Sequence, residues 1–235
     1  MEDAGVSRAV FIHTGTFYGW DNRYVMDSTK QYSEWATGVV TLSPDNPQHH
    51  EVLQDAVQNY SIRGLRGTSD QNGQISSIAV RKLCILARDL GITVNCMVTD
   101  DLGRLYEIEL MSRQFDELNI VIDHCFMLNT VRKTEETLIA LERLAHQPNI
   151  HAKLTSGTHG SARVYPHEDM HVPLKRVIDA FGPERCVWGS NFPNALWSKG
   201  TTYVQNLSLF TDELGLSQWE QEQILGGTAE RLWFP

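Results

Sequence analysis

Short runs of β-branched and other apolar residues recur along the whole chain, and each run is bounded by turn residues. Runs of this kind are typical of strands that are buried on both faces of a parallel sheet. Each run is followed by a polar loop and then by an amphipathic stretch. We therefore expect seven strands, at Arg8–His13, Thr37–Leu42, Ile62–Arg66, Thr93–Val98, Ile120–His124, Ile150–Leu154 and Cys186–Gly189.

The stretches between these runs carry apolar residues at helical spacing. In His50–Tyr60, for example, Val52, Leu53, Ala56 and Val57 fall on one face of a helix. The same pattern predicts helices at Asn22–Gln31, His50–Tyr60, Gln74–Leu90, Gly103–Phe115, Thr134–His146, Met170–Ala180, Tyr203–Leu214 and Ser217–Gly226.

Alternating strands and helices predict an α/β fold with a parallel sheet. No shift in composition and no Pro- or Ser-rich linker divides the sequence, so we expect one domain over residues 1–235. Periodicity alone does not separate a (β/α)8 barrel from an open, doubly wound sheet. No Gly-rich phosphate loop follows a strand, which is a weak argument against a nucleotide-binding sheet.

The balance of charge narrows the classes of partner. The formal net charge is −9, whereas nucleic acids and anionic membranes bind basic surfaces. No apolar run approaches the ~18 residues of a membrane span. The four cysteines form no C-x-x-C pair and lie in or beside apolar segments, as reduced core thiols do. These features predict a cytoplasmic protein without a nucleic-acid or membrane partner.

Nearly every predicted strand ends on a polar or ionisable residue. In a parallel barrel the active site forms at the carboxyl ends of the strands. A purely structural barrel would not require such residues there. The strand ends carry His13-Thr14, Ser43-Pro44-Asp45, Arg66-Gly67-Thr68, Thr99-Asp100-Asp101, Asp123-His124, Lys153-Leu154-Thr155-Ser156 and Ser190-Asn191.

His124 is the most informative of these residues. Continued strand alternation would place it on the same side as Ile120 and Ile122, facing the barrel interior. An imidazole at the barrel mouth could act as a general acid or base, or bind a metal. The structural alternative is a hydrogen-bonded histidine without a chemical role.

Arg66, Lys153 and Asn191 are the further candidates. A buried guanidinium must be paired, and a substrate carboxylate suits its fork of donors; an internal salt bridge is the alternative. The same reasoning applies to Lys153. Asn191 can donate and accept hydrogen bonds but is neither a strong base nor a good metal ligand.

The sequence His167-Glu168-Asp169-Met170-His171 matches the zinc-protease pattern H-E-x-x-H. That chemistry needs both histidines on one face of a continuous helix. Pro166 precedes the motif, and we expect Pro173 to clash with the turn that would hold it. A loop leading into a helix N-terminus is the expected context.

Several segments in order resemble the amidohydrolase-related superfamily, in particular its lactonase-like branch, which includes 2-pyrone-4,6-dicarboxylate lactonase. Ala4–Val10 resembles the family passage AGV-RAV, and Ile120–His124 resembles IVIDH. Tyr18–Tyr24 resembles YG-DN-Y, and Phe181–Pro193 resembles FGPDR-MWGSDWP. The ending Gly226–Leu232 resembles GGNA-RL.

Two departures from the family pattern matter. The family opens with a strand bearing H-x-H, and this sequence contains no H-x-H. We therefore expect a TIM-type barrel that lacks its first strand and has the second to eighth. We also expect the chain to be truncated at its N-terminus. Asn191 stands where most relatives have an Asp. His13 and His124, even with His159, are too few for a zinc site, so we expect neither metal nor cofactor.

The resemblance implies a hydrolase acting on a lactone or similar carboxylated small molecule by attack of water on a carbonyl. It assigns catalytic roles to His124, Asn191 and Lys153: His124 polarises or protonates the substrate and Asn191 orients water. Arg66 would bind the substrate carboxylate. Further substrate contacts are expected from Tyr165, His13 and Ser156.

Two alternatives stay open at this point. One is a metal-dependent decarboxylase of the same superfamily, with a longer natural chain supplying the ligands. The other is a catalytically inactive barrel that serves in binding or assembly. A barrel without its first strand exposes two strand edges, which favour aggregation or pairing with another chain, so a homo-oligomer is an option.

Overall fold

The computed structural model describes residues 1–98, 102–155, 160–193 and 200–235. The chain forms two compact units, which we describe separately. The first unit holds residues 1–97, 106–120 and 232–235, and the second holds residues 98–105 and 121–231.

A parallel sheet is the centre of the first unit. Its strands β1 (Ala9–Ile12), β2 (Ala36–Thr41), β3 (Ile62–Gly67) and β4 (Thr93–Cys96) lie in chain order. All six residues of β2 are buried, whereas those of β1 are half-buried. The apolar runs thus form buried parallel strands, as the sequence predicts.

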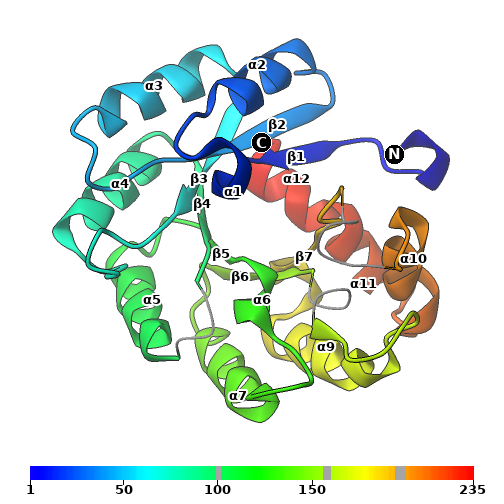
Figure 1. Ribbon diagram of the computed structural model, residues 1–235. Coiled ribbons are helices and arrows are strands. Elements are labelled where there is room, and N and C mark those ends of the chain that lie inside the picture. The colour runs from blue at the N-terminus through cyan, green and yellow to red at the C-terminus, as the bar shows by residue number, and fades with distance from the viewer. Residues whose placement is uncertain (99–101, 156–159, 194–199) are drawn as a thin grey trace. The chain divides into compact units, whose positions relative to one another are not determined.

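Helices cover this sheet. The structure has η1 (Glu2–Ala4), α1 (Gly15–Tyr18), α2 (Arg23–Gln31), α3 (His49–Asn59), α4 (Ile78–Asp89) and α5 (Gly103–Gln114). Helices α2, α3 and α4 pack on β2, β3 and β4 respectively (Figure 1). Helix α4 shows why: Val80, Leu83, Cys84 and Ala87 recur on one buried face, and the Ser77 hydroxyl accepts the Val80 N–H at the helix start.

The second unit pairs β6 (Ile150–Leu154) with β7 (Cys186–Trp188) in parallel. The short strand β5 (Ile120–Ile122) begins in the first unit and continues into the second. Helix α9 (Glu168–Phe181) packs on β6 and on α7 (Thr134–Leu144). The remaining elements are α6 (His124–Met127), η2 (Pro183–Arg185), α10 (Tyr203–Ser208), the π-helical η4 (Leu209–Glu213), α11 (Gln218–Glu222), the π-helical η5 (Gln223–Gly227) and α12 (Thr228–Trp233).

All seven predicted strands are confirmed, but one boundary is wrong in a way that affects the site. Strand β5 ends at Ile122, and His124 has a φ of 57°. Strand alternation therefore does not set the direction of its side chain. The helix predicted from Gln74 begins only at Ile78, because the Glu107 carboxylate accepts the N–H groups of Ile75 and Ser76 and holds them outside the helix.

The four cysteines are buried thiols, as expected of core residues. Among the described residues, no helix combines the length and the hydropathy that a bilayer crossing requires.

Candidate functional site

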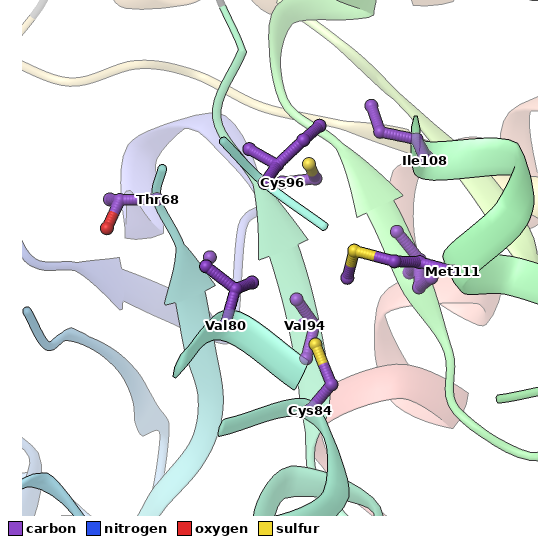
Figure 2. Close-up of a pocket in the computed structure, with 10 residues that line it drawn as sticks. Thr68, Val80, Cys84, Val94, Cys96, Ile108 and Met111 are labelled. Carbon is purple, nitrogen blue, oxygen red and sulfur yellow. The ribbon is translucent and has the colours of Figure 1, made fainter. Parts of the chain in front are cut away.

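A small apolar hollow lies on the helix side of the sheet in the first unit (Figure 2). It has a volume of about 20 Å³, room for roughly one water molecule. Val94 and Cys96 of β4 line it together with Cys84 and Met111. Burial raises the pKa of the Cys84 thiol to about 12. An apolar lining of this size and an inert thiol do not make a substrate site.

The opposite face of the same sheet carries a row of polar residues. Asn95 lies between Val94 and Cys96 in the strand, so its side chain points away from that hollow. The strand register aligns Arg66 with Asn95 on one side and with Thr41 on the other. Thr41, Arg66 and Asn95 therefore share one face, near the carboxyl ends of β2, β3 and β4.

His13 follows β1 at this end of the sheet and is 3% exposed. Its Nε2 is 3.2 Å from the carbonyl oxygen of Asp21, and the Arg66 guanidinium donates to the His13 carbonyl at 3.1 Å. Burial lowers the pKa of His13, and the charge of Arg66 acts in the same direction. Both effects favour the neutral imidazole, and the structure brings His13 and Arg66 together.

A larger hollow of about 330 Å³ adjoins His13 in the first unit. Its volume falls within the range of small-molecule pockets, which begins at about 300 Å³. Three tyrosines contribute to its walls, with His13 and Thr14 at the strand end. Its lining consists of Phe11, Ile12, His13, Thr14, Tyr18, Tyr24, Val25, Ser28 and Tyr32.

His124 lies in the second unit on a left-handed turn. The four residues of α6, His124–Met127, have φ values of 57°, 45°, 61° and 57°. L-residues rarely adopt this conformation singly and almost never in succession. The turn redirects the chain after β5 and leaves the His124 side chain 8% exposed.

Three successive residues of this segment are tied to the end of β6. The Lys153 ammonium donates to the Asp123 carboxylate at 2.7 Å. Nδ1 of His124 is 2.5 Å from the Thr155 hydroxyl oxygen, and the Cys125 thiol donates to the Lys153 carbonyl at 3.3 Å. Asp123, Lys153 and Thr155 are all buried. The structure therefore brings His124 and Lys153 together, with Lys153 paired to Asp123.

Strand β7 delivers Gly189 and Asn191 to the second unit's site. Gly189 packs so closely on the Thr155 methyl group that a Cβ atom there would overlap it, and the same Cβ atom would also meet the Lys153 side chain. Asn206 holds the segment by accepting the Trp188 indole N–H and donating to the Ser190 carbonyl, each at 3.1 Å. Asn191, two residues beyond Gly189, has a φ of 51° and is half-buried.

Of the other predicted substrate contacts, the structure describes Tyr165. The Tyr165 hydroxyl donates to the Glu213 carboxylate at 2.9 Å, and burial with this contact raises its pKa. Ser156 lies outside the described residues, as does His159.

The expectation about His167–His171 is half confirmed. His167 caps α9 rather than lying inside it, so the two histidines do not share a continuous helix face. Nδ1 of His167 is 2.9 Å from the Arg163 carbonyl oxygen, and Nε2 of His171 is 2.8 Å from that of Pro166. The expected clash of Pro173 is wrong, because α9 continues through this residue from Glu168 to Phe181.

The described donors at the site do not fit a metal ion. Among the residues that the structure describes, no three His, Cys, Asp or Glu side chains are grouped as metal ligands. The Asp123 carboxylate is bonded to Lys153, and Nδ1 of His124 is bonded to Thr155. No step of the reaction proposed below passes through a metal.

The sequence places Asp123 and Thr155 among the strand ends but assigns no role to them, and it does not single out Gly189, Thr41 or Asn95. Thr155 stands beside Ser156 in the same strand end, and both are hydroxyl residues, so the sequence alone did not distinguish them. Asn95 could have been found from period-two alternation, because it is the polar residue between Val94 and Cys96. The role of Gly189 depends on a close approach that no sequence pattern specifies.

The chain is similar in sequence to known lactone hydrolases. A 4-sulfomuconolactone hydrolase from Rhizobium radiobacter is 23% identical over 203 residues, which are 83% of this chain and 64% of the relative. An L-fucono-1,5-lactonase from Burkholderia ambifaria is 36% identical over 113 residues, 46% of this chain and 37% of the relative. The chain thus spans less than two thirds of the length of these relatives.

Solved structures show the same fold. An amidohydrolase from Burkholderia multivorans matches with a TM-score of 0.82 at 19% identity, covering 100% of this chain and 85% of that one. A TIM-barrel protein from Bordetella bronchiseptica matches with a TM-score of 0.71 at 18% identity, covering 99% and 79%. The α/β fold is therefore that of TIM-barrel amidohydrolases, while the absence of a first strand stays a prediction.

The sequence itself matches the profile of one family, described as amidohydrolase, over residues 1–234. This match includes every segment on which the resemblance rests. The chain belongs to the amidohydrolase family.

Proposed function

We propose that this chain carries the catalytic residues of a hydrolase that opens a lactone ring by attack of water on the carbonyl carbon. The observation that carries the proposal is His124, which follows β5 and is bonded through Nδ1 to Thr155 beside the Asp123–Lys153 ion pair. The lactone-hydrolase relatives support the reaction type.

In this proposal His124 acts through Nε2. The imidazole accepts a proton from water as the water oxygen bonds to the carbonyl carbon, giving a tetrahedral intermediate. The intermediate then collapses, the ester C–O bond breaks, and His124 returns the proton to the leaving ring oxygen. The product is one hydroxy acid, and general acid–base catalysis of this kind contributes about 10²–10⁴-fold.

The other predicted residues receive supporting roles. Asn191 orients the attacking water by hydrogen bonding, because an amide is too weak a base to activate it. Lys153 acts through its ion pair with Asp123, which holds the segment that carries His124. Arg66, His13, Tyr165 and Ser156 stay predicted substrate contacts, and Arg66 is the proposed partner of a substrate carboxylate.

The substrate class follows from the relatives and from Arg66. We expect a lactone bearing an anionic group, such as a carboxylated or sulfonated lactone, with sugar 1,5-lactones as the neutral comparison. A cytoplasmic location, independence from metals and assembly into a homo-oligomer remain predictions.

A panel of these lactones tests the proposal. We expect the wild-type chain to hydrolyse at least one of them and His124→Gln to lower kcat by about 10²-fold or more. His50→Gln, at an exposed histidine outside the site, is the matched control and should keep wild-type rates.

Two results would contradict the proposal. Full activity of His124→Gln would remove the proposed base. A folded wild-type chain that hydrolyses no lactone in the panel would favour a binding or assembly role instead.

A further inference from the structure

We infer that Gly189 and Thr155 together fix the tautomer and orientation of His124, with Gly189 acting as a positioning residue through the room it leaves for Thr155. The inference rests on the proposed function, because it assumes that Nε2 of His124 is the reacting atom.

The Thr155 hydroxyl is hydrogen-bonded to Nδ1 of His124. One ring nitrogen of a neutral imidazole carries the proton, and a threonine hydroxyl can accept a hydrogen bond from Nδ1–H or donate one to an unprotonated Nδ1. For Nε2 to accept a proton from water, Nδ1 must carry the hydrogen and donate it to Oγ1 of Thr155. The distance of 2.5 Å shows that the two atoms are bonded.

Gly189 packs closely against the Thr155 side chain. The backbone of Gly189 does not have a positive φ, so its conformation is open to other residues. The need for glycine is one of space, because a Cβ atom would overlap the Thr155 methyl group.

The shape of threonine links the packing of Gly189 to the hydrogen bond with His124. Thr155 is 2% exposed and β-branched, so its methyl and hydroxyl groups turn together about one bond. Moving the methyl away from a new Cβ atom therefore also moves Oγ1 away from His124. The nearest other neighbour of that Cβ atom would be Cε of Lys153 at 3.2 Å, a tight contact that a flexible side chain can relieve.

Four variants of the full chain test this inference. Gly189→Ala should disturb His124, and Thr155→Val should remove the hydroxyl while keeping the shape of the side chain. Thr155→Ser keeps the hydroxyl and removes the methyl. The double variant Gly189→Ala/Thr155→Ser then has room for the added Cβ atom and should recover the properties of Thr155→Ser.

Two readouts are needed. Nitrogen-15 spectra of the imidazole give the tautomer of His124, and kcat/KM against pH on a hydrolysed lactone gives its effect on catalysis. We expect the Nδ1–H tautomer in the wild type, in Thr155→Ser and in Gly189→Ala/Thr155→Ser. Each of these has a hydroxyl group at position 155 and enough space for the side chain that carries it. Gly189→Ala and Thr155→Val should shift the tautomer and lower kcat/KM by about 10- to 100-fold, as small displacements at active sites do.

Gly226→Ala is the matched control, because a Cβ atom there meets no atom within 4 Å. A Gly189→Ala chain with the wild-type His124 spectrum would overturn the inference, as would a folded double variant that resembles Gly189→Ala alone. The spectra need no substrate, so they decide the positioning role even if the wild type hydrolyses no lactone and the proposed function fails.

Discussion

At the scale of single residues, the left-handed turn at His124–Met127 is the most unusual feature of the chain. Each L-residue in this conformation costs roughly 1–2 kcal/mol relative to the right-handed one. The buried side chains of Cys125 and Phe126 and the contacts of His124 with β6 offset this strain. Strained backbone that persists in a fold is often found where a side chain must be aimed.

The turn predicts a stabilising substitution at Met127, whose side chain is 37% exposed and loses little packing when replaced. Asparagine tolerates a positive φ better than methionine does. Met127→Asn should raise the free energy of unfolding by about 0.5–1 kcal/mol, measured by urea denaturation. Met127→Val is the control and should lower it, because a β-branched side chain is strained at positive φ. Equal stability of the two variants would contradict the left-handed turn.

At the scale of elements, the end of β6 is joined to the segment after β5 by a buried ion pair. Lys153 and Asp123 lie in different elements, and their side chains are 10% and 0% exposed. A buried pair adds little net stability over an apolar pair, but the loss of one partner leaves an uncompensated charge. The pair therefore makes the two segments depend on each other.

A double-mutant cycle measures this dependence. Lys153→Met should lower the free energy of unfolding by about 3–5 kcal/mol, because the buried Asp123 carboxylate loses the ammonium group that neutralises its charge. The double variant Asp123→Asn/Lys153→Met should recover most of that loss in urea denaturation. A strictly additive cycle would show that the two side chains do not interact as described.

At the scale of the whole molecule, the predictions from the sequence succeed where they depend on periodicity and fail where they depend on contacts. The family, the α/β fold and all seven strands follow from apolar runs and motifs. Neither the end of β5 at Ile122 nor the pairing of Lys153 with Asp123 follows from these runs and motifs. His124 belongs to the second unit and Arg66 to the first, so their predicted approach stays a prediction.

The response of stability to pH is also a property of the whole chain. Burial lowers the pKa of His13 in the folded state, so the unfolded chain takes up a proton at higher pH than the folded chain does. Stability should therefore fall as pH decreases below the unfolded pKa of about 6.5, with a slope of at most about 1.4 kcal/mol per pH unit from this residue.

Urea denaturation between pH 7.5 and pH 5, values chosen to bracket roughly one unit on either side of that pKa, measures this slope. We expect the free energy of unfolding of His13→Gln to fall less steeply with decreasing pH than that of the wild type, because glutamine does not titrate. His50→Gln, at an exposed position, is the control for replacing a histidine by glutamine. An unchanged slope in His13→Gln would mean that His13 is not held neutral by burial.

The sequence by itself determined the order of strands and helices, the family and the identity of His124 as the central candidate, because these depend on local periodicity and on motifs. Only the tertiary structure decided what His124 contacts. The left-handed turn, the Thr155 hydroxyl and the space left by Gly189 arise from residues more than 30 positions apart in the sequence. Such contacts depend on distance in the folded chain, and apolar and polar periodicity carries no record of that distance.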